Sequence, residues 1–520
     1  MPMTAPQATV ATTLAGEIPV RESRDITTIA RGGGALLLAS AFGNGLNYAF
    51  GIFLARTLGA EEFGLYALAL TIFNMISLTV VFGMDVGATK FVSHHLAEGQ
   101  DAKARSTIIA AASLAFCSGL VAAIGLAWLA HPIAMTLYNK PDLTLSLMCF
   151  AAAVPLVTLT SVLLSTLQAY QTVRYTVLIK YLWEPVGKFM LAGLFLWAGF
   201  HLLGVLISII LAFAVSTVLA IYALHQLAFR GGSQLLAQNF QEAKALLAYC
   251  LPLVISNIFG VIAPRSDILI LGYWATAQDI GIYLAAFQTA AIISLVLSAF
   301  IAGAAPIISR AWSQGDRARM GEVYQAVSRL AITVSLPIFC CFVLFSREIL
   351  EMFGANFTAG TTALLLLAIG QVFNNATGSA NSVLLMSGHS RLVMTNTIIM
   401  GIVLLAATAA SIPFWGITGA ALAASLTFIV TNLIRVMQVW KIHRVQPYTW
   451  ALAKPAAAAM LATGLVLVLR VSVTAIPIPL LGLTVGMLYL SGLLLLGINQ
   501  QDRFILHSLF SRFGGFLEKK

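Results

Sequence analysis

About fourteen apolar stretches, each close to 20 residues long, follow one another through this sequence from residue 35 onward. A helix of about 20 apolar residues spans the hydrocarbon core of a bilayer. Seven stretches begin near residues 35, 63, 107, 144, 175, 202 and 248, and seven more near 281, 326, 362, 392, 417, 451 and 476. The chain is therefore predicted to be an all-α polytopic membrane protein with about fourteen transmembrane helices.

The composition agrees with this prediction. Of the 520 residues, 59% are hydrophobic and only 9% are charged, whereas a soluble domain carries about 25% charged residues. No polar block is large enough to form a separate soluble domain. Residues 1–34 are polar and mixed, without the short charged head and early apolar core of a signal peptide, and are predicted to form a cytosolic N-terminal tail.

The distribution of lysine and arginine predicts the orientation in the membrane, because cytoplasmic connections retain these residues. With the N-terminus inside, 22 of the 29 basic residues fall in inner segments. Four fall in outer connections, Arg56, Lys140, Arg347 and Arg470, and three within spans, Lys180, Lys188 and Arg265. Both termini are therefore predicted to be cytoplasmic, and the net charge of +10 reflects this bias and not nucleic-acid binding.

The chain contains an internal repeat, which is common in transporters. A Gly-x-Tyr motif opens a helix at Gly64 and Tyr66 and again at Gly281 and Tyr283, 217 positions later, and further similarities recur in the same order. We predict two pseudo-symmetric six-helix lobes, residues 35–225 and 248–440, around a central cavity. Residues 226–247 would form a cytosolic inter-lobe connection, residues 451–497 an extra helix pair, and residues 498–520 a cytosolic tail.

Two motifs connect this architecture to a known family. The sequence ARxLGxxxFGxY occurs at Ala55–Tyr66 and RxDxxxLG at Arg265–Gly272. With about fourteen helices, the chain resembles the polysaccharide transporters of the multidrug/oligosaccharidyl-lipid/polysaccharide (MOP) exporter superfamily, and within it the Wzx-type flippases. The resemblance covers roughly residues 25 to 500. It implies a flippase of the bacterial inner membrane that moves undecaprenyl-pyrophosphate-linked oligosaccharides, with a polymerase and a chain-length regulator of the same pathway as partners.

Arg265 and Asp267 are charged residues inside the predicted seventh span. A charge at a helix centre costs about 2.5 to 3.5 kcal/mol on insertion scales, so such residues usually face a partner or a wet cavity. Two positions apart on a helix, they point in nearly opposite directions and are not expected to pair. Each needs its own partner, and at least one is expected to face a polar cavity. The alternative for Asp267 is that it only ties its helix to a neighbouring one.

A second charged group lies in the predicted fifth span. Lys180, Glu184 and Lys188 recur every four residues and share one helix face, with Arg174 one to two turns earlier and Pro185 predicted to kink the helix. The stripe either satisfies its own charges or, together with Arg265, lines a cationic cavity. Guanidinium and ammonium groups suit a pyrophosphate. Glu184 and Asp267 are candidates for coupling transport to an ion.

Amide side chains in the spans are candidates for contacts with sugar hydroxyl groups. They are Asn257, Gln288, Gln371, Asn374, Asn375 and Asn381. The segment AIGQVFNNATGSAN, which contains four of these residues, is unusually polar for a span. It could equally bind a neighbouring helix through small and amide residues.

Other chemistry is not indicated. The outer connections are short, which argues against a glycosyltransferase, and RGGGA at Arg31 lacks the Lys-Ser/Thr of a phosphate loop. The five cysteines have no metal-site spacing. We therefore expect no enzyme activity, cofactor or metal. Transport would proceed by alternating access in a chain for which a monomer suffices. The competing functions are a drug or cation antiporter, the other large branch of the superfamily, and a lipid II flippase.

Overall fold

The computed structural model describes residues 18–229, 244, 246–250, 265–472 and 478–496. These residues form an all-helical protein in which no strand is described. Within them, nine helices are long and apolar enough to cross a membrane. Two of the nine are broken at a glycine and each of these accounts for two predicted spans, and shorter helices account for the rest. The architecture therefore accommodates about fourteen spans, as the apolar stretches predict.

The first half of the chain is built from helices that turn back at short connections. They are α1 (Ile18–Val80), α2 (Met84–Ala97), α3 (Asp101–Pro132) continued by the π-helix η1 (Ile133–Leu137), α4 (Leu143–Ala169), α5 (Arg174–Thr176), the π-helix η2 (Val177–Trp183), α6 (Glu184–Trp197) and α7 (His201–Ala228). The first two predicted spans are the two parts of α1. They are separated at Gly59, whose φ of 78° suits glycine because it has no Cβ.

The second half continues in the same way. It contains α9 (Ser266–Trp274), α10 (Ala277–Ser313), α11 (Arg317–Glu351), the 3-10 helix η4 (Ala355–Gly360), α12 (Thr361–Ala376), α13 (Ala380–Met386), α14 (Ser390–His443), the 3-10 helix η5 (Trp450–Leu452), α15 (Ala453–Ser472) and α16 (Ile478–Leu496). Gly416, with φ 52° and ψ −131°, divides α14 into the predicted eleventh and twelfth spans.

The predicted kink near Pro185 takes the form of a π-helical segment. The π-helix η2 ends at Trp183, and the α-helix resumes at Glu184 with Pro185 in its first turn. Proline has no N–H to donate to the preceding turn, so a regular α-helix cannot run unbroken through this point. π-Helical turns are rare and are frequent at functional sites. The predicted fifth span therefore consists of α5, η2 and α6.

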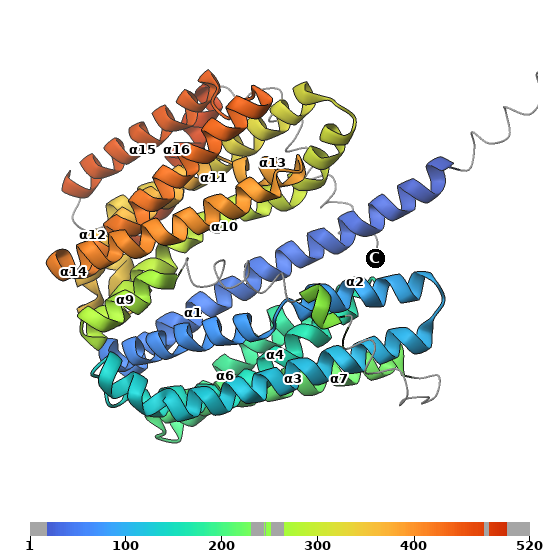
Figure 1. Ribbon diagram of the computed structural model, residues 1–520. Coiled ribbons are helices and arrows are strands. Elements are labelled where there is room, and N and C mark those ends of the chain that lie inside the picture. The colour runs from blue at the N-terminus through green and yellow to red at the C-terminus, as the bar shows by residue number, and fades with distance from the viewer. Residues whose placement is uncertain (1–17, 230–243, 245, 251–264, 473–477, 497–520) are drawn as a thin grey trace, which may run out of the picture.

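The helices lie in two groups on either side of α1. In Figure 1, α2, α3, α4, α6 and α7 lie on one side of α1, and α10, α11, α13, α14, α15 and α16 on the other. One hydrophobic core joins both groups and includes Phe63 and Phe150 together with Tyr283 and Phe357. It lies at the end of the molecule that contains Gly59 and the turn between α9 and α10, called here the outer end and predicted to be periplasmic.

At the opposite end, called here the inner end, the two groups have separate cores. One is formed by residues such as Val92, Leu167 and Leu224 of the first half. Another is formed by Ile308, Tyr324 and other residues of the second half. A smaller cluster near the inner end packs Leu246 and Cys250 against Met84 and Ala111 of the first half. The two halves of the chain are therefore joined mainly, but not solely, by packing at the outer end. The exact lobe boundaries stay a prediction.

Two glycines of the repeated motif form the closest contact between the halves. A Cβ atom on Gly64 would lie 1.7 Å from the carbonyl oxygen of Ala277, and one on Gly281 would lie 2.3 Å from that of Ala60. The contact is reciprocal, as expected where two related surfaces meet across a two-fold axis. This geometry supports the predicted pseudo-symmetry and explains why both motifs carry glycine.

Candidate functional site

Arg265 stands immediately before α9 as its N-cap residue and is exposed. Its guanidinium lies over the ring of Phe287 in α10, with Cζ 4.9 Å from the ring centroid. Within the part of the chain that the structure describes, it forms no hydrogen bond or ion pair. The aromatic ring supports the side chain, and the N–H groups of the guanidinium remain available to a ligand.

Asp267 has a different environment, although it is only two residues away. Its side chain is 1% exposed. The Tyr283 hydroxyl donates a hydrogen bond of 2.6 Å to one carboxylate oxygen, and the Ile268 backbone N–H donates one of 2.8 Å to the other. Asp267 therefore ties α9 to α10, which is the second of the two roles that the sequence left open. Removing either partner would leave a buried polar group unsatisfied, which costs about 1–3 kcal/mol.

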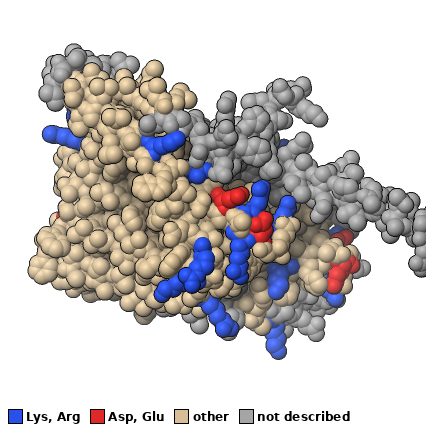
Figure 2. Space-filling view, turned by 90° about the horizontal axis from the view of Figure 1, so that it is seen from above, with Lys and Arg blue, Asp and Glu red and all other residues tan. Residues whose placement is uncertain are grey.

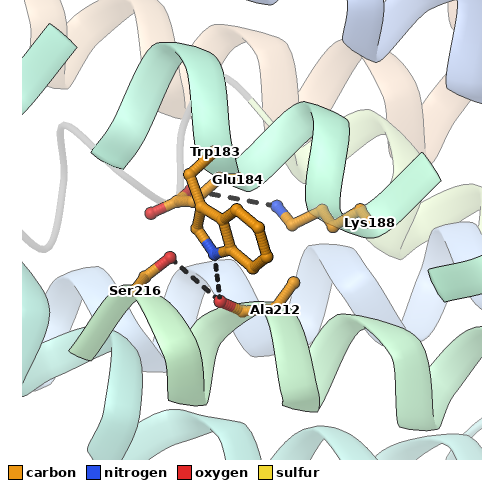
Figure 3. Close-up of polar contacts among 5 residues, drawn as sticks. All are labelled: Trp183, Glu184, Lys188, Ala212 and Ser216. Carbon is orange, nitrogen blue, oxygen red and sulfur yellow. Dashed lines mark hydrogen bonds and ion pairs between the residues drawn. The ribbon is translucent and has the colours of Figure 1, made fainter. Parts of the chain in front are cut away.

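The Glu184 and Lys188 side chains lie between α6 and α7. The Lys188 ammonium is 3.9 Å from one oxygen of Glu184, with about one sixth of each side chain exposed, and it lies 4.3 Å from the centroid of the Phe213 ring. Figure 3 shows that the other Glu184 oxygen points away from Lys188. The separation of 3.9 Å is long for a charge-assisted bond, so the pair is held loosely.

Trp183 fixes the segment that carries this pair. Its indole N–H donates to the backbone carbonyl of Ala212 in α7 at 3.2 Å, and the Ser216 hydroxyl donates to the same carbonyl at 3.0 Å (Figure 3). The end of the π-helix η2 is thereby anchored to α7. Glu184, the next residue, is placed by this anchor.

The other two cations of the fifth span, Arg174 and Lys180, are exposed. Neither forms a hydrogen bond or ion pair with a described residue. The described contacts do not bring Arg265 together with Arg174, Lys180 or Lys188, so a shared cationic cavity stays a prediction.

The candidate amides are in varied surroundings. The Asn375 amide is fully buried and donates to the Ile293 carbonyl at 2.8 Å and to the Ser335 hydroxyl at 2.5 Å. The side-chain oxygens of Gln288 and Asn381 are buried without a partner in the described structure. Gln371 is buried, and Asn374 accepts a hydrogen bond from Asn432 at 2.9 Å. Asn257 lies outside the described residues. Asn375 therefore holds helices together through its amide N–H groups, and its side-chain oxygen, like those of Gln288 and Asn381, is a buried acceptor without a partner among the described residues.

The structure also places two arginines that the sequence assigns to cytosolic connections inside helices. Arg329 lies in α11 and is 5% exposed, and Arg435 lies in the second part of α14 and is partly buried. Sequence patterns do not single them out as candidates, because each lies close to a predicted end of a long apolar stretch. The helical spacing of Arg435 with Asn432 is the signal that could have identified it.

Two basic side chains link the halves at the outer end. The Lys140 ammonium donates to the carbonyl oxygens of Gly272 at 2.8 Å and Ala275 at 2.9 Å. Burial lowers the pKa of Lys140, and the Asp279 carboxylate offsets part of this effect. The Arg56 Nε donates to the Met352 carbonyl at 2.6 Å. These bonds, with the Gly64 and Gly281 contact, are called here the outer latch.

The charge distribution is uneven over the surface. Figure 2 shows most of the visible Lys and Arg side chains in the right half of the view, toward the end of the molecule at which α1 begins. The described residues contain no group of three His, Cys, Asp or Glu side chains suited to a metal ion. The surface distribution agrees with the predicted orientation of the chain, which stays a prediction.

Comparison with known proteins places the chain in a family. The model of the family described as "Polysaccharide biosynthesis protein" matches residues 29–312, more than half of the chain, and the MatE model matches residues 252–408. The chain is 22% identical over 415 residues to a protein named "Probable low-salt glycan biosynthesis flippase Agl15" of Haloferax volcanii, covering 78% of this chain and 82% of that protein. It is 24% identical over 346 residues to the "Succinoglycan biosynthesis transport protein ExoT" of Rhizobium meliloti, covering 66% of each.

Solved structures with this fold are membrane transporters. An inward-facing multidrug resistance MATE family transporter of the MOP superfamily gives a TM-score of 0.68 at 14% identity, covering 79% of this chain and 98% of that one. The lipid II flippase MurJ in an inward closed conformation gives a TM-score of 0.66 at 14% identity, and the match covers 86% of this chain and 97% of that one. The fold is therefore that of the MOP superfamily. The chain belongs to the polysaccharide biosynthesis protein family and is a multi-pass membrane protein, which confirms the resemblance drawn from the two motifs.

Proposed function

We propose that the protein is a flippase that moves undecaprenyl-pyrophosphate-linked oligosaccharide units across the bacterial inner membrane for surface polysaccharide synthesis. The family match supports a role in polysaccharide synthesis. The relatives are named as a glycan biosynthesis flippase and a succinoglycan transport protein, not as enzymes. The pyrophosphate and the undecaprenyl carrier are inferred from the resemblance and from the charges of the site.

The observation that carries this proposal is the contrast between Arg265 and Asp267. The carboxylate is buried and accepts two hydrogen bonds, whereas the guanidinium is exposed and forms no hydrogen bond or ion pair with a described residue. The charge that this segment offers to a ligand is therefore positive. A positive charge in a water-poor site favours a phosphate and disfavours the cationic substrates of a drug antiporter.

Alternating access supplies the proposed mechanism. The two lobes are joined at the outer end by the shared core and the outer latch, and at the inner end they have separate cores apart from the packing of Leu246 and Cys250 against the first half. In the proposed mechanism, a cavity between the inner-end cores would open toward the predicted cytoplasm. The head group would enter there while the lipid tail stays in the bilayer. Rocking of the lobes would then break the latch and open the outer end.

Glu184 is the better of the two candidates for ion coupling. Asp267 accepts hydrogen bonds from Tyr283 and from the backbone of Ile268, so changing its charge would disrupt the contact between α9 and α10. Glu184 has only a loose contact with Lys188 and retains one oxygen directed away from it. A carboxylate in this state can exchange a proton without breaking a structural bond.

Deleting the gene tests the function in the cell. We expect loss of surface polysaccharide and accumulation of undecaprenyl-linked oligosaccharide in the inner leaflet of the inner membrane, because the units are made but not translocated. Surface polymer and extracted lipid-linked oligosaccharide are measured in the same strains, with the gene restored on a plasmid as the control. Unchanged polymer with altered accumulation of a cationic dye would support the antiporter instead, and loss of cell-wall precursor transport would support a lipid II flippase.

A further inference from the structure

Arg435 is a partly buried charged group of the described second half whose hydrogen-bonding capacity is largely unused. It lies on the face of α14 that also carries Asn432 and Val439, both of which are buried. Residues spaced by three and four along a helix share one face. The Arg435 side chain is therefore attached on the packed side of the helix, where an uncompensated charge is costly.

The polar contacts of Arg435 do not satisfy it. Its Nη1 donates to the side-chain oxygen of Asn432 over 3.4 Å, and its Nε is buried without a partner. The amide of Asn432 donates in turn to the side-chain oxygen of Asn374 in α12 at 2.9 Å. A guanidinium has five N–H donors, and most of those of Arg435 have no acceptor among the described residues. The two asparagines orient the arginine without neutralising it.

No carboxylate near Arg435 in the sequence can neutralise its charge. The sequence contains no aspartate or glutamate between Glu351 and Asp502, so the described parts of α12, α13, α14, α15 and α16 contribute only neutral and basic side chains. In the described residues, Arg435 forms no ion pair. A partly buried arginine that is oriented by amides and has no acidic partner is suited to bind an anion that comes from outside the protein.

Arg435 lies deeper toward the inner end than Arg265. At 1.5 Å per residue, about 28 Å of helix separates Arg435 from the break at Gly416, and about 14 Å separates Arg265 from Trp274 at the outer end of α9. The two cations are therefore at different depths in the same half of the chain. A head group that enters from the inner end would reach the level of Arg435 before that of Arg265.

We propose that Arg435, oriented by Asn432 and Asn374, forms an inner anion subsite that receives an oxyanion of the transported head group. This inference rests on the proposed function and extends it, because it gives the flippase two separate anion contacts along the path. The ligand group is a phosphate of the carrier or a carboxylate of an acidic sugar. Both are oxyanions that accept paired N–H bonds from a guanidinium.

Binding of soluble anions to the purified full-length protein tests the subsite. Isothermal titration calorimetry is carried out with inorganic pyrophosphate and with glucuronate on the wild type and on R435A, R435K and R265A. We expect R435A to weaken binding of one of the two anions by at least about tenfold, because a charged, paired hydrogen bond is lost. R435K keeps the charge but loses the planar pair of N–H donors of the guanidinium. We expect its affinity for the anion to lie between those of R435A and the wild type. The affected anion identifies the source of the oxyanion.

Arg391→Ala is the matched control, because Arg391 is an exposed arginine on the same helix. It should bind both anions as the wild type does. If R435A lowers the melting temperature, R435Q provides a second neutral variant that retains amide donors. If R435A or R435Q binds both anions with wild-type affinity while R265A loses binding, the proposed Arg435 subsite is wrong. The proposed function would still stand in that case. Absence of binding to wild-type protein and to every variant would instead contradict the proposed function as well.

Discussion

Replacing Arg265 with alanine is expected to abolish flipping without reducing the amount of protein in the membrane. The guanidinium is exposed and contacts the Phe287 ring, so its loss should not unfold the chain. Hydrogen bonds to charged groups contribute about 1.5–3 kcal/mol each, and loss of two such bonds to a phosphate would reduce transport by roughly 100-fold or more. Surface polymer in the deletion strain carrying the variant measures the effect.

Two further variants show whether the charge or the packing matters. Arg265→Lys keeps the charge and should retain part of the activity, because lysine binds phosphate as a point charge. Phe287→Leu removes only the cation–π contact, which is worth about 0.5–2 kcal/mol, and should reduce transport modestly. Normal transport by Arg265→Ala, with normal expression, would show that no cationic contact at this position is needed.

Gly64→Val is expected to destabilise the contact between the two halves of the chain. The added Cβ would lie 1.7 Å from the Ala277 carbonyl oxygen and 2.9 Å from the Gly281 backbone nitrogen. Backbone atoms cannot rotate away as a side chain would, so the two halves must separate at the outer end. Overpacking a core costs about 1–3 kcal/mol and occasionally more. We expect a melting temperature lowered by several degrees and loss of transport, because the outer latch cannot close.

Gly125→Ala is the matched control for this prediction. Gly125 also lies in a helix, α3, but a Cβ atom there would meet nothing within 4 Å. Exchanging glycine for alanine inside a helix is expected to be neutral or to stabilise by about 0.5–1 kcal/mol. The melting temperature and the outside labelling of a single cysteine near Lys140 are measured for both variants. A Gly64→Val protein that matches Gly125→Ala in stability and labelling would rule out the close lobe contact.

Much of the fold follows from the sequence, because a bilayer imposes a simple rule on helix length. The apolar stretches predict the spans, and the breaks at Gly59 and Gly416 fall between spans that the sequence separates. The repeated Gly-x-Tyr motif predicts the symmetry. Its physical reason, the close contact of Gly64 and Gly281, depends on two segments 217 residues apart and could not be read from either copy alone.

The site is less predictable, because its properties depend on neighbours in space. Spacing alone indicates that Arg265 and Asp267 do not pair, but Tyr283 as the partner of Asp267 becomes evident only after folding. Pro185 predicts a disturbance in the fifth span, and the structure gives it the form of a π-helix. The sequence assigns Arg435 to a cytosolic connection, since hydropathy places the end of a helix poorly when polar residues such as Asn432 precede it.

Transfer of the substrate between the leaflets of reconstituted vesicles tests whether the protein is a flippase that depends on Arg265. Purified full-length protein is placed in proteoliposomes containing undecaprenyl-pyrophosphate-linked oligosaccharide with a fluorescent sugar, and quenching from outside measures the share exposed in each leaflet over time. We expect rapid exchange between leaflets with the wild type and the slow background rate of empty liposomes with Arg265→Ala. The proposed function would be contradicted if correctly folded wild-type protein exchanged the substrate only at the background rate and actively transported a cationic dye.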